Sequence, residues 1–405
     1  MMKKIFNNLK YIGFWAFFLS ANTVYAGTGE LSGYVAMDTR YFLESPLYNQ
    51  QAQGDIPNIV IEPEYYYVSD NNLHTLTARP FFRLDANDPE RTHFDFRQLD
   101  WLYQTRDWEV KAGVSKVFWG VIESKHLVDI INQTDTIEDI DSEDKLGQPM
   151  IQYARYYDWG NVSFFYLPYF RKNTYPGKKG RIRAPVVVQT DRAEYDSGAE
   201  EWHPDFALRY DHTFGDWDIG VAHFSGTSRE PVLQTRNFSG QAVLVPYYDL
   251  IDQTSLDLQF TGESWLWKLE AMSRSGQGDR FYAVSGGFEY TFYSIFDTVM
   301  DIGVLTEYHR DNRGAGAPLT LLDDDVFFGG RLTLNNIADT AFLGGVIFDT
   351  NTQARSWNIE VEHRYNDHWK IEFDARIISS NAANNTFEQV LRNDDFMQLR
   401  LARYF

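Results

Sequence analysis

Apolar and polar side chains alternate along most of this chain, and the alternation is regular enough to define its elements. In residues 369–377, Trp, Ile, Phe, Ala and Ile share one face, and Lys, Glu, Asp and Arg share the other. Segments 108–114, 217–221 and 357–362 repeat the pattern. A period of two is that of a β-strand with one apolar face. The pattern therefore predicts long strands whose second face carries charges of both signs.

Eighteen strands of this kind are predicted, an even number, as in bacterial single-chain barrels. They cover residues 30–41, 56–67, 72–83, 91–105, 107–116, 149–157, 160–170, 203–214, 216–225, 250–262, 264–275, 279–292, 296–310, 324–336, 340–349, 353–365, 367–378 and 393–405. In segment 91–105 the apolar phase shifts between Phe96 and Leu99, which predicts a β-bulge.

The connections between these strands alternate in length. Short ones lie at 69–71, 106–107, 158–159, 215–216, 262–264, 294–295, 336–339 and 366–367. Most longer ones lie between them, at 42–55, 84–90, 117–148, 171–202, 226–249, 311–323 and 379–392. Short periplasmic turns and long outer loops are typical of outer-membrane barrels. Five tryptophans lie within three residues of a short turn and predict an aromatic belt there: Trp108, Trp159, Trp217, Trp265 and Trp369.

The two ends of the chain agree with a closed barrel in an outer membrane. The last strand alternates up to Phe405, and pairing with the first strand would remove an edge that otherwise invites aggregation. At the other end, Lys3, Lys4 and Lys10 precede the short apolar run 11–19, which is followed by Val24-Tyr25-Ala26. This arrangement predicts a secretory signal peptide over 1–26 and a barrel over 27–405.

Composition excludes several classes of protein. The formal net charge of −20 disfavours nucleic-acid binding through phosphates. The absence of cysteine excludes disulfides and thiol chemistry. The histidines form no metalloprotease motif and no serine-hydrolase elbow occurs, so we expect no enzyme, no catalytic or metal site and no cofactor. A hydrolase whose site is assembled across strands, without a local motif, is the alternative.

Loop 117–148 is the most distinctive connection, with eight carboxylates against two lysines. It also carries Leu127, Val128, Ile130 and Ile131, which a solvated loop would rarely have. We expect the loop to fold into the barrel as a constriction; a passive loop on the outer rim is the alternative. The carboxylates expected near the pore axis are Glu123, Asp129, Asp135, Glu138, Asp139 and Asp141.

The same loop raises the question of calcium. Asp139, Asp141 and Glu143 have the spacing that starts an EF-hand loop, but Asp144 occupies the sixth position, where that loop needs glycine. A solvated acidic rim is the alternative to a calcium site.

The polar faces of the strands predict a charged lumen, which is either a solvated channel or a lattice of ion pairs. Its expected cations are Arg97, Lys111, Arg155, Arg209, Arg331, Arg364 and Arg376. A second cationic group opens loop 171–202: Arg171, Lys172, Lys178, Lys179, Arg181 and Arg183. On the outer face this group would bind lipopolysaccharide phosphates or an anionic solute; a solvated loop is the alternative.

Residues 113–150 carry a resemblance to known proteins. Gly113, the run 118–120, Glu123-Ser124, the run 127–132 and the run 146–150 together resemble Gram-negative outer-membrane porin-like β-barrels. More distantly, they are similar to alginate-export-type barrels. The resemblance implies about eighteen strands, a charged lumen and loops folded into the pore.

The expected function is therefore passive passage of small polar or charged solutes across the outer membrane, with loop 117–148 as an acidic constriction. The expected partners are outer-membrane lipid, lipopolysaccharide and the barrel-assembly machinery. One alternative is an export or retention partner of an envelope polysaccharide or lipid system, which would add an inner-membrane transport system as a partner. Another is a barrel whose loops bind an outside partner. The solute, the direction of transport and the oligomeric state stay open.

Overall fold

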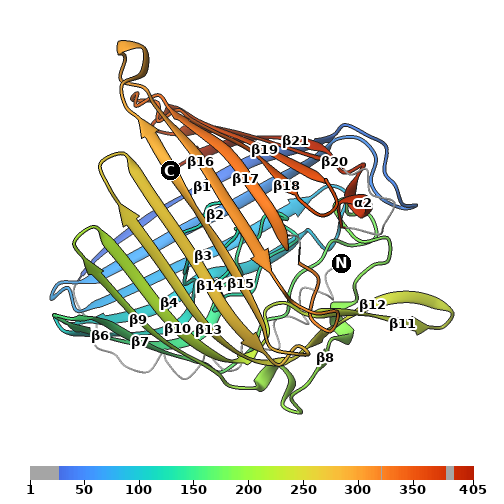
Figure 1. Cartoon of the computed structure of the whole chain (residues 1–405), viewed down its shortest axis with the longest axis horizontal. Coiled ribbons are helices and arrows are strands. Elements are labelled where there is room, and N and C mark those ends of the chain that lie inside the picture. Colours follow the sequence, from blue (N-terminus) through green and yellow to red (C-terminus); the bar gives the residue numbers. More distant parts are fainter. Residues whose placement is uncertain (1–26, 321, 380–386) are drawn as a thin grey trace.

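A computed structural model describes residues 27–320, 322–379 and 387–405, and it forms a closed antiparallel barrel of eighteen strands (Figure 1). The strands are β1 (Gly27–Phe42), β2 (Ile56–Ser69), β3 (His74–Asp85), β4 (His93–Gln104), β5 (Trp108–Ser115), β6 (Gln148–Tyr157), β7 (Gly160–Leu167), β9 (Asp205–Phe214), β10 (Trp217–Thr227), β13 (Leu250–Thr261), β14 (Trp265–Ser275), β15 (Phe281–Phe292), β16 (Asp301–Asp311), β17 (Asp324–Thr333), β18 (Ala341–Asp349), β19 (Arg355–Asn366), β20 (Trp369–Ser379) and β21 (Phe396–Tyr404). The predicted fold class and the number of strands are confirmed. The strand predicted at 296–310 begins only at Asp301, and residues 293–300 replace the short turn predicted at 294–295. The predicted signal peptide lies outside the described residues.

The barrel closes where its last strand meets its first. β21 pairs with β1 from Tyr34–Tyr404 to Phe42–Phe396. Gly33 and Phe405 exchange two backbone hydrogen bonds, of 3.1 and 3.0 Å between N and O. Closure leaves neither of these strands with a free edge.

The predicted bulge lies between β3 and β4. Arg79 pairs with Gln98, whereas the next residue, Pro80, pairs with Phe96. Arg97 is therefore the extra residue, and the bulge shifts the inward and outward phase of β4.

Two of the long connections contain structure that the alternation did not predict. β11 (Val232–Phe238) and β12 (Gln241–Tyr248) form a hairpin, and the short β8 (Glu194–Tyr195) adds to β12 in parallel. The described helical pieces are η2 (Thr190–Arg192), η3 (Glu200–Trp202), η4 (Ile295–Asp297) and α2 (Phe387–Leu391). No helix in the described ranges is long and apolar enough to cross a membrane.

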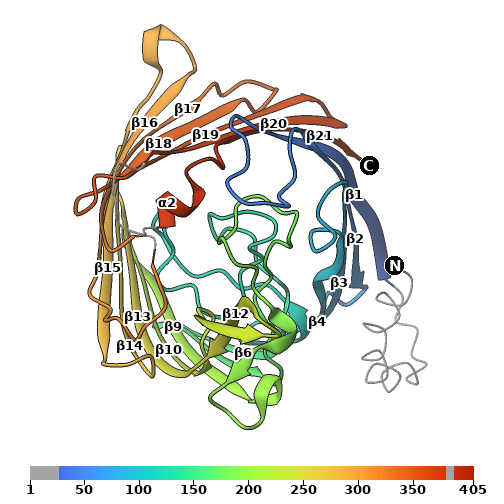
Figure 2. The same cartoon turned by 90° about the vertical axis from the view of Figure 1, so that its right-hand side faces the viewer.

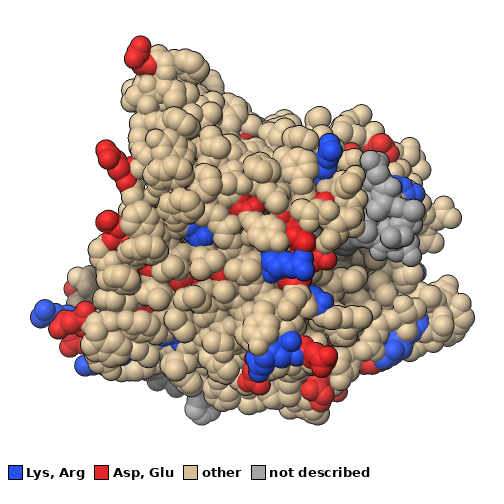
Figure 3. Space-filling model, in the orientation of Figure 1, with Lys and Arg blue, Asp and Glu red and all other residues tan. Residues whose placement is uncertain are grey.

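The barrel wall is apolar outside and charged inside. Outward side chains such as Met37, Ile59, Leu208, Phe328 and Leu399 are exposed, whereas inward Asp38, Arg83, Glu270, Arg274 and Glu307 are buried. On the face shown in Figure 3, atoms of uncharged residues cover most of the surface. A water-soluble protein places charged side chains outside and apolar ones inside. A barrel that faces lipid requires the reverse, which is the arrangement found here.

The five tryptophans of the predicted belt all lie at the end of the barrel that carries the short turns. Trp159, Trp217 and Trp265 are exposed on the outside. Trp159 stacks with Tyr157 and Tyr210, and Trp265 stacks with Trp267. Amphipathic rings of this kind suit the boundary between lipid and water.

The two faces of β19 provide a direct test of this orientation. Ile359 is 45% exposed on the outer face, and the neighbouring Asn358 points inward. We expect Ile359→Arg to cost roughly 2–4 kcal/mol if the site lies near the bilayer midplane, since arginine there faces lipid. Asn358→Arg adds the same side chain to the polar lumen and should cost far less. Urea-induced unfolding in lipid vesicles measures both; equal losses would contradict the assigned register.

Candidate functional site

Residues 116–147, which join β5 to β6, cross the inside of the barrel and are called the crossing loop below. Figure 2 looks into the barrel from the end with the long loops, and coil segments fill much of the ring of strands. The crossing loop contacts side chains of β14, β16 and β17 along its first half. Its second half contacts β1, β3, β4 and β20. The loop therefore reaches the wall opposite β5 before it returns to β6.

The first attachment uses carboxylates of the wall and backbone amides of the loop. Glu270 accepts hydrogen bonds from the N–H groups of Val121 and Ile122, at 2.6 and 3.0 Å. Gly120 has φ +139°, and a Cβ there would lie 2.9 Å from the Glu270 carboxylate, so glycine permits this approach.

Glu307 continues this attachment from β16. It accepts hydrogen bonds from the N–H groups of Glu123 and Ser124, and from the Ser124 hydroxyl at 2.6 Å. Charge-assisted hydrogen bonds of this type hold the loop backbone in one register.

The second attachment is apolar. Trp119, Leu127, Val128, Ile130 and Ile131 of the crossing loop are at most 7% exposed. They join one buried cluster with side chains of the wall: Met150, Phe165, Leu167, Ala207, Ala222, Phe224, Ile251, Met272, Phe281 and Ala283. The apolar residues noted in the sequence, Leu127, Val128, Ile130 and Ile131, thus form the surface of the loop that packs against β6–β15.

The third attachment is a buried ion-pair network centred on Arg83. Its guanidinium binds both oxygens of Glu138 in the crossing loop and both oxygens of Asp38 in β1, the latter at 3.2 and 3.0 Å. Arg83, Asp38 and Glu138 are 1%, 0% and 5% exposed. Arg400 of β21 also binds Asp38, at 2.9 Å. The network connects the loop to β1, β3 and β21.

Each of the six carboxylates predicted for a constriction has a cationic partner. Asp135 binds Arg97, Asp139 binds Arg40, and Asp141 binds Arg376. Asp129 binds Lys145 within the loop, and Glu123 binds Arg331 and lies 3.6 Å from Lys268. The structure places all six inside the barrel, but their charge is largely matched by the wall.

The surroundings of the loop carboxyls shift their pKa values in opposite directions. Burial by itself would raise the pKa of Glu138, but the guanidinium groups of Arg83 and Arg91 hold it well below its usual range. Burial and the charge of Asp139 raise the pKa of Asp141 to about 6, against the opposing effect of Arg376. Burial, Glu138 and Asp141 raise the pKa of Asp144 to about 7. The last two carboxyls therefore titrate near neutral pH.

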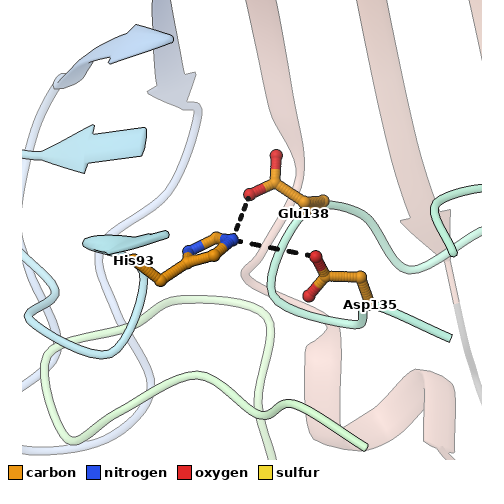
Figure 4. A group of neighbouring side chains, drawn as sticks. All are labelled: His93, Asp135 and Glu138. Atoms are coloured by element: carbon orange, nitrogen blue, oxygen red, sulfur yellow. Dashed lines mark ion pairs between the residues drawn. The ribbon is translucent and has the colours of Figure 1, made fainter. Parts of the chain in front are cut away.

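One group in the described part of the chain has the composition of a metal site, and Figure 4 shows it. His93 Nε2 lies 3.8 Å from Asp135 and 3.5 Å from Glu138. Both carboxylates already bind arginine, Asp135 through Arg97 at 2.6 Å and Glu138 through Arg83. The guanidinium groups take the positions that a cation would occupy, so the group is part of the ion-pair network.

The EF-hand spacing does not produce a cage for calcium either. Asp139 and Asp141 face Arg376, whereas Glu143 binds His126 at 2.7 Å. Asp139 and Asp141 thus have an arginine as partner, and Glu143 has a histidine.

Six of the seven cations predicted for the lumen face it. Arg209 binds Asp257 at 2.7 Å, Arg364 lies over the inward ring of Tyr404, and Lys111 points inward from β5. Arg97, Arg331 and Arg376 bind the crossing loop as described above.

The prediction for Arg155 was wrong. Arg155 pairs with the outward Trp108 across β5 and β6 and lies over the Tyr157 ring, 5.6 Å from its centroid. It follows Ile151 and Tyr153 on the outer face, close to a short turn. An arginine near a strand end can reach the polar interface, so a charge does not by itself mark the lumen.

The basic start of loop 171–202 turns inward. Arg171 binds Asp95, Arg181 binds Asp394, and Arg183 donates hydrogen bonds to backbone carbonyls. Lys172 binds Glu201 at 2.9 Å. Lys178 and Lys179 are exposed. Four of the six cations therefore stabilise the packing of this loop.

An open cavity of about 360 Å³ remains on one side of the crossing loop. On the loop side it is lined by Asp139, Asp141, Glu143 and Asp144. On the wall side it is lined by residues of β19, β20 and β21, among them Glu360, Glu362, Glu372, Asp374, Arg376 and Arg400. The cavity combines an open volume with a high density of carboxylates.

Residues that sequence analysis missed hold the loop in place. Arg83 and Glu307 are not among the predicted site residues, although alternation with outward Phe82, Leu84, Val304 and Tyr308 places both on the inner face. The phase of the strand therefore contained the signal for their orientation. The phase of the strand gave no signal for their partners in the crossing loop. Glu138 lies 55 residues from Arg83 in sequence, and Glu123 lies 184 residues from Glu307.

No protein-family model matches the chain, and no curated protein matches it. Among solved structures it is similar to a loop-deletion form of OmpT, an outer membrane protein of Vibrio cholerae. The identity is 9%, the match covers 94% of this chain and 100% of that chain, and the TM-score is 0.45. It is also similar to a mutant of Rh. blastica porin, at 11% identity, 93% and 100% coverage and a TM-score of 0.43. The barrel itself is established by the strand pairing described above.

The Arg83 network is tested by removing its centre. Arg83→Met leaves Asp38 and Glu138 buried without their shared cation, and we expect a loss of about 3–5 kcal/mol in the free energy of unfolding. Arg331→Met is the matched control, because the Arg331 side chain is 38% exposed and also binds a loop carboxylate. For Arg331→Met the loss in the free energy of unfolding should stay under about 1 kcal/mol. Urea titration followed by tryptophan fluorescence gives both values, and a loss at Arg83 no larger than the control would contradict the anchoring role.

Proposed function

We propose that the protein is an outer-membrane channel through which small polar or charged solutes pass passively, and that it is not an enzyme. The observation that carries the proposal is the open cavity beside the crossing loop, inside a closed barrel with a charged inner face. Barrels of sixteen to eighteen strands leave an aqueous interior. The crossing loop narrows this interior, and the lining charges select among solutes.

The crossing loop is the proposed constriction, with Glu123, Asp129, Asp135, Glu138, Asp139 and Asp141 in it. Since these carboxylates bind arginines or lysines, their main effect is to hold the loop across the pore. The negative field of the constriction then depends on the carboxylates that face the cavity.

Conductance of the purified barrel in planar bilayers tests the proposal. We expect the wild type to show discrete steps of single-channel current. Deletion of 121–145 should make these steps larger, because it removes the segment that crosses the lumen. The arginines released by the deletion face water, so the barrel should still form. A wild type without conductance would overturn the channel proposal and favour the export or retention alternative. Steps of equal size in both proteins would show that the loop is not a constriction.

The pKa values of two loop carboxyls predict a dependence on pH. Asp141 and Asp144 titrate at about 6 and about 7, so both are ionised at pH 8 and mostly protonated at pH 5. We expect the preference for potassium over chloride, measured as a reversal potential, to fall as the pH is lowered across this range. Burial raises both pKa values most. The charges of Glu138, Asp139, Asp141, Arg97 and Arg376 also contribute.

The control is the double variant Asp141→Asn with Asp144→Asn. It should show a flatter pH profile between pH 5 and pH 8, with a cation preference near the wild-type value at low pH. An unchanged profile in the double variant would assign the titration to other groups.

A further inference from the structure

The space between the crossing loop and the wall differs on the two sides of the loop. Toward β6–β15, Trp119, Val128 and Ile131 pack directly against Phe165, Phe224 and Met272 in one buried apolar cluster. Interiors packed in this way leave little room for water. Toward β19–β21 lies the open cavity of about 360 Å³.

We propose that solutes pass the barrel off its axis, between crossing-loop residues 138–144 and strands β19–β21, and that this side passage admits cations in preference to anions. The inference rests on the proposed channel function and adds to it the location of the path and the class of solute. It concerns wall residues of β19 and β20 as much as the loop.

The cations around the passage are occupied and largely covered. Arg376 binds Asp141 at 2.6 Å, and its side chain is 13% exposed. Arg40 binds Asp139, Gln398 and the carbonyl of Glu138, and its side chain is 7% exposed. Arg400, the third arginine that lines the passage, binds Asp38, lies 3.6 Å from Glu372 and is 24% exposed. The positive charges of the passage are therefore all paired.

Three carboxylates of the passage are more open to water than its arginines. The side chains of Glu360 and Glu362 on β19 are 40% and 53% exposed, and that of Glu143 on the loop is 54% exposed. Lys370 binds Glu362 and Glu372, but this lysine is 18% exposed. Solutes thus encounter carboxylates from both walls of the passage.

Charge placed in this way attracts cations. A narrow passage with walls of low dielectric constant concentrates the field of its charges, which raises the local concentration of ions of opposite sign. The Debye length is about 10 Å at 0.1 M salt, so carboxylates on facing walls of such a gap act together. Anions meet the same field as a barrier.

The absence of cysteine makes the path measurable, since one introduced cysteine is the only thiol of the full chain. Glu362→Cys places a thiol in the passage, and Asp211→Cys is the matched control. Asp211 is an inward carboxylate of β9 on the opposite wall, half-buried, and at a similar distance from the short turns. Each variant is treated in a bilayer with a methanethiosulfonate that carries either a trimethylammonium or a sulfonate group.

At Glu362→Cys we expect the trimethylammonium reagent to react faster than the sulfonate reagent. Modification with the trimethylammonium reagent should lower the conductance in potassium chloride and reduce the potassium preference of the variant by about twofold or more, since it converts a neutral thiol into a positively charged disulfide adduct. At Asp211→Cys the same modification should change the conductance and the potassium preference less than it does at Glu362→Cys.

The outcomes separate this inference from the proposed function. If the wild type conducts but modification at Glu362→Cys leaves conductance and selectivity unchanged, the side passage is overturned and the channel function stands. A larger effect at Asp211→Cys also overturns it and moves the path to the opposite wall. A wild type that does not conduct overturns both.

Discussion

The buried contact between Arg83, Asp38 and Glu138 is the interaction on which the arrangement of the lumen depends. It lies where β1, β3 and the crossing loop meet, and all three side chains are nearly inaccessible. Charges placed there without partners would be strongly unfavourable, so Glu138 has to stay with Arg83. This requirement positions residues 135–139 against β1, β3 and β4, while Asp141 reaches Arg376 of β20. The cavity that remains is lined by residues 138–144 of the loop and by β19–β21. The shape of the lumen therefore follows from one electrostatic constraint together with the apolar packing on the other side.

The two halves of the crossing loop are attached by opposite chemistry. Along the first half, the wall supplies carboxylates, Glu270 and Glu307, and the loop supplies backbone N–H groups. Along the second half, the wall supplies guanidinium groups and the loop supplies carboxylates. Because the attachments use different groups, a shift of the loop by one residue would break both sets. Such a loop is held as a fixed partition of the lumen.

Because most loop carboxylates bind arginines of the wall, the acidic composition of the loop does not by itself give the lumen a negative charge. The carboxylates that stay most open to water include Glu360 and Glu362 on β19, whose side chains are 40% and 53% exposed. An acidic loop in a barrel thus serves first as a structural element. Under the proposed channel function, selectivity would then be set by the carboxylates that stay exposed to water.

Alternation by itself determined the number of strands, most of the short turns, the bulge at Arg97 and the tryptophan end of the barrel, because each depends on neighbours along the chain. It did not determine that Arg155 faces outward, since an arginine near a strand end can reach the interface. The hairpin of β11 and β12 inside the predicted loop 226–249 was also missed. Only the tertiary structure decided which acid meets which arginine, and where the lumen stays open. Those contacts join residues far apart in sequence, and their energies depend on burial, which no local pattern encodes.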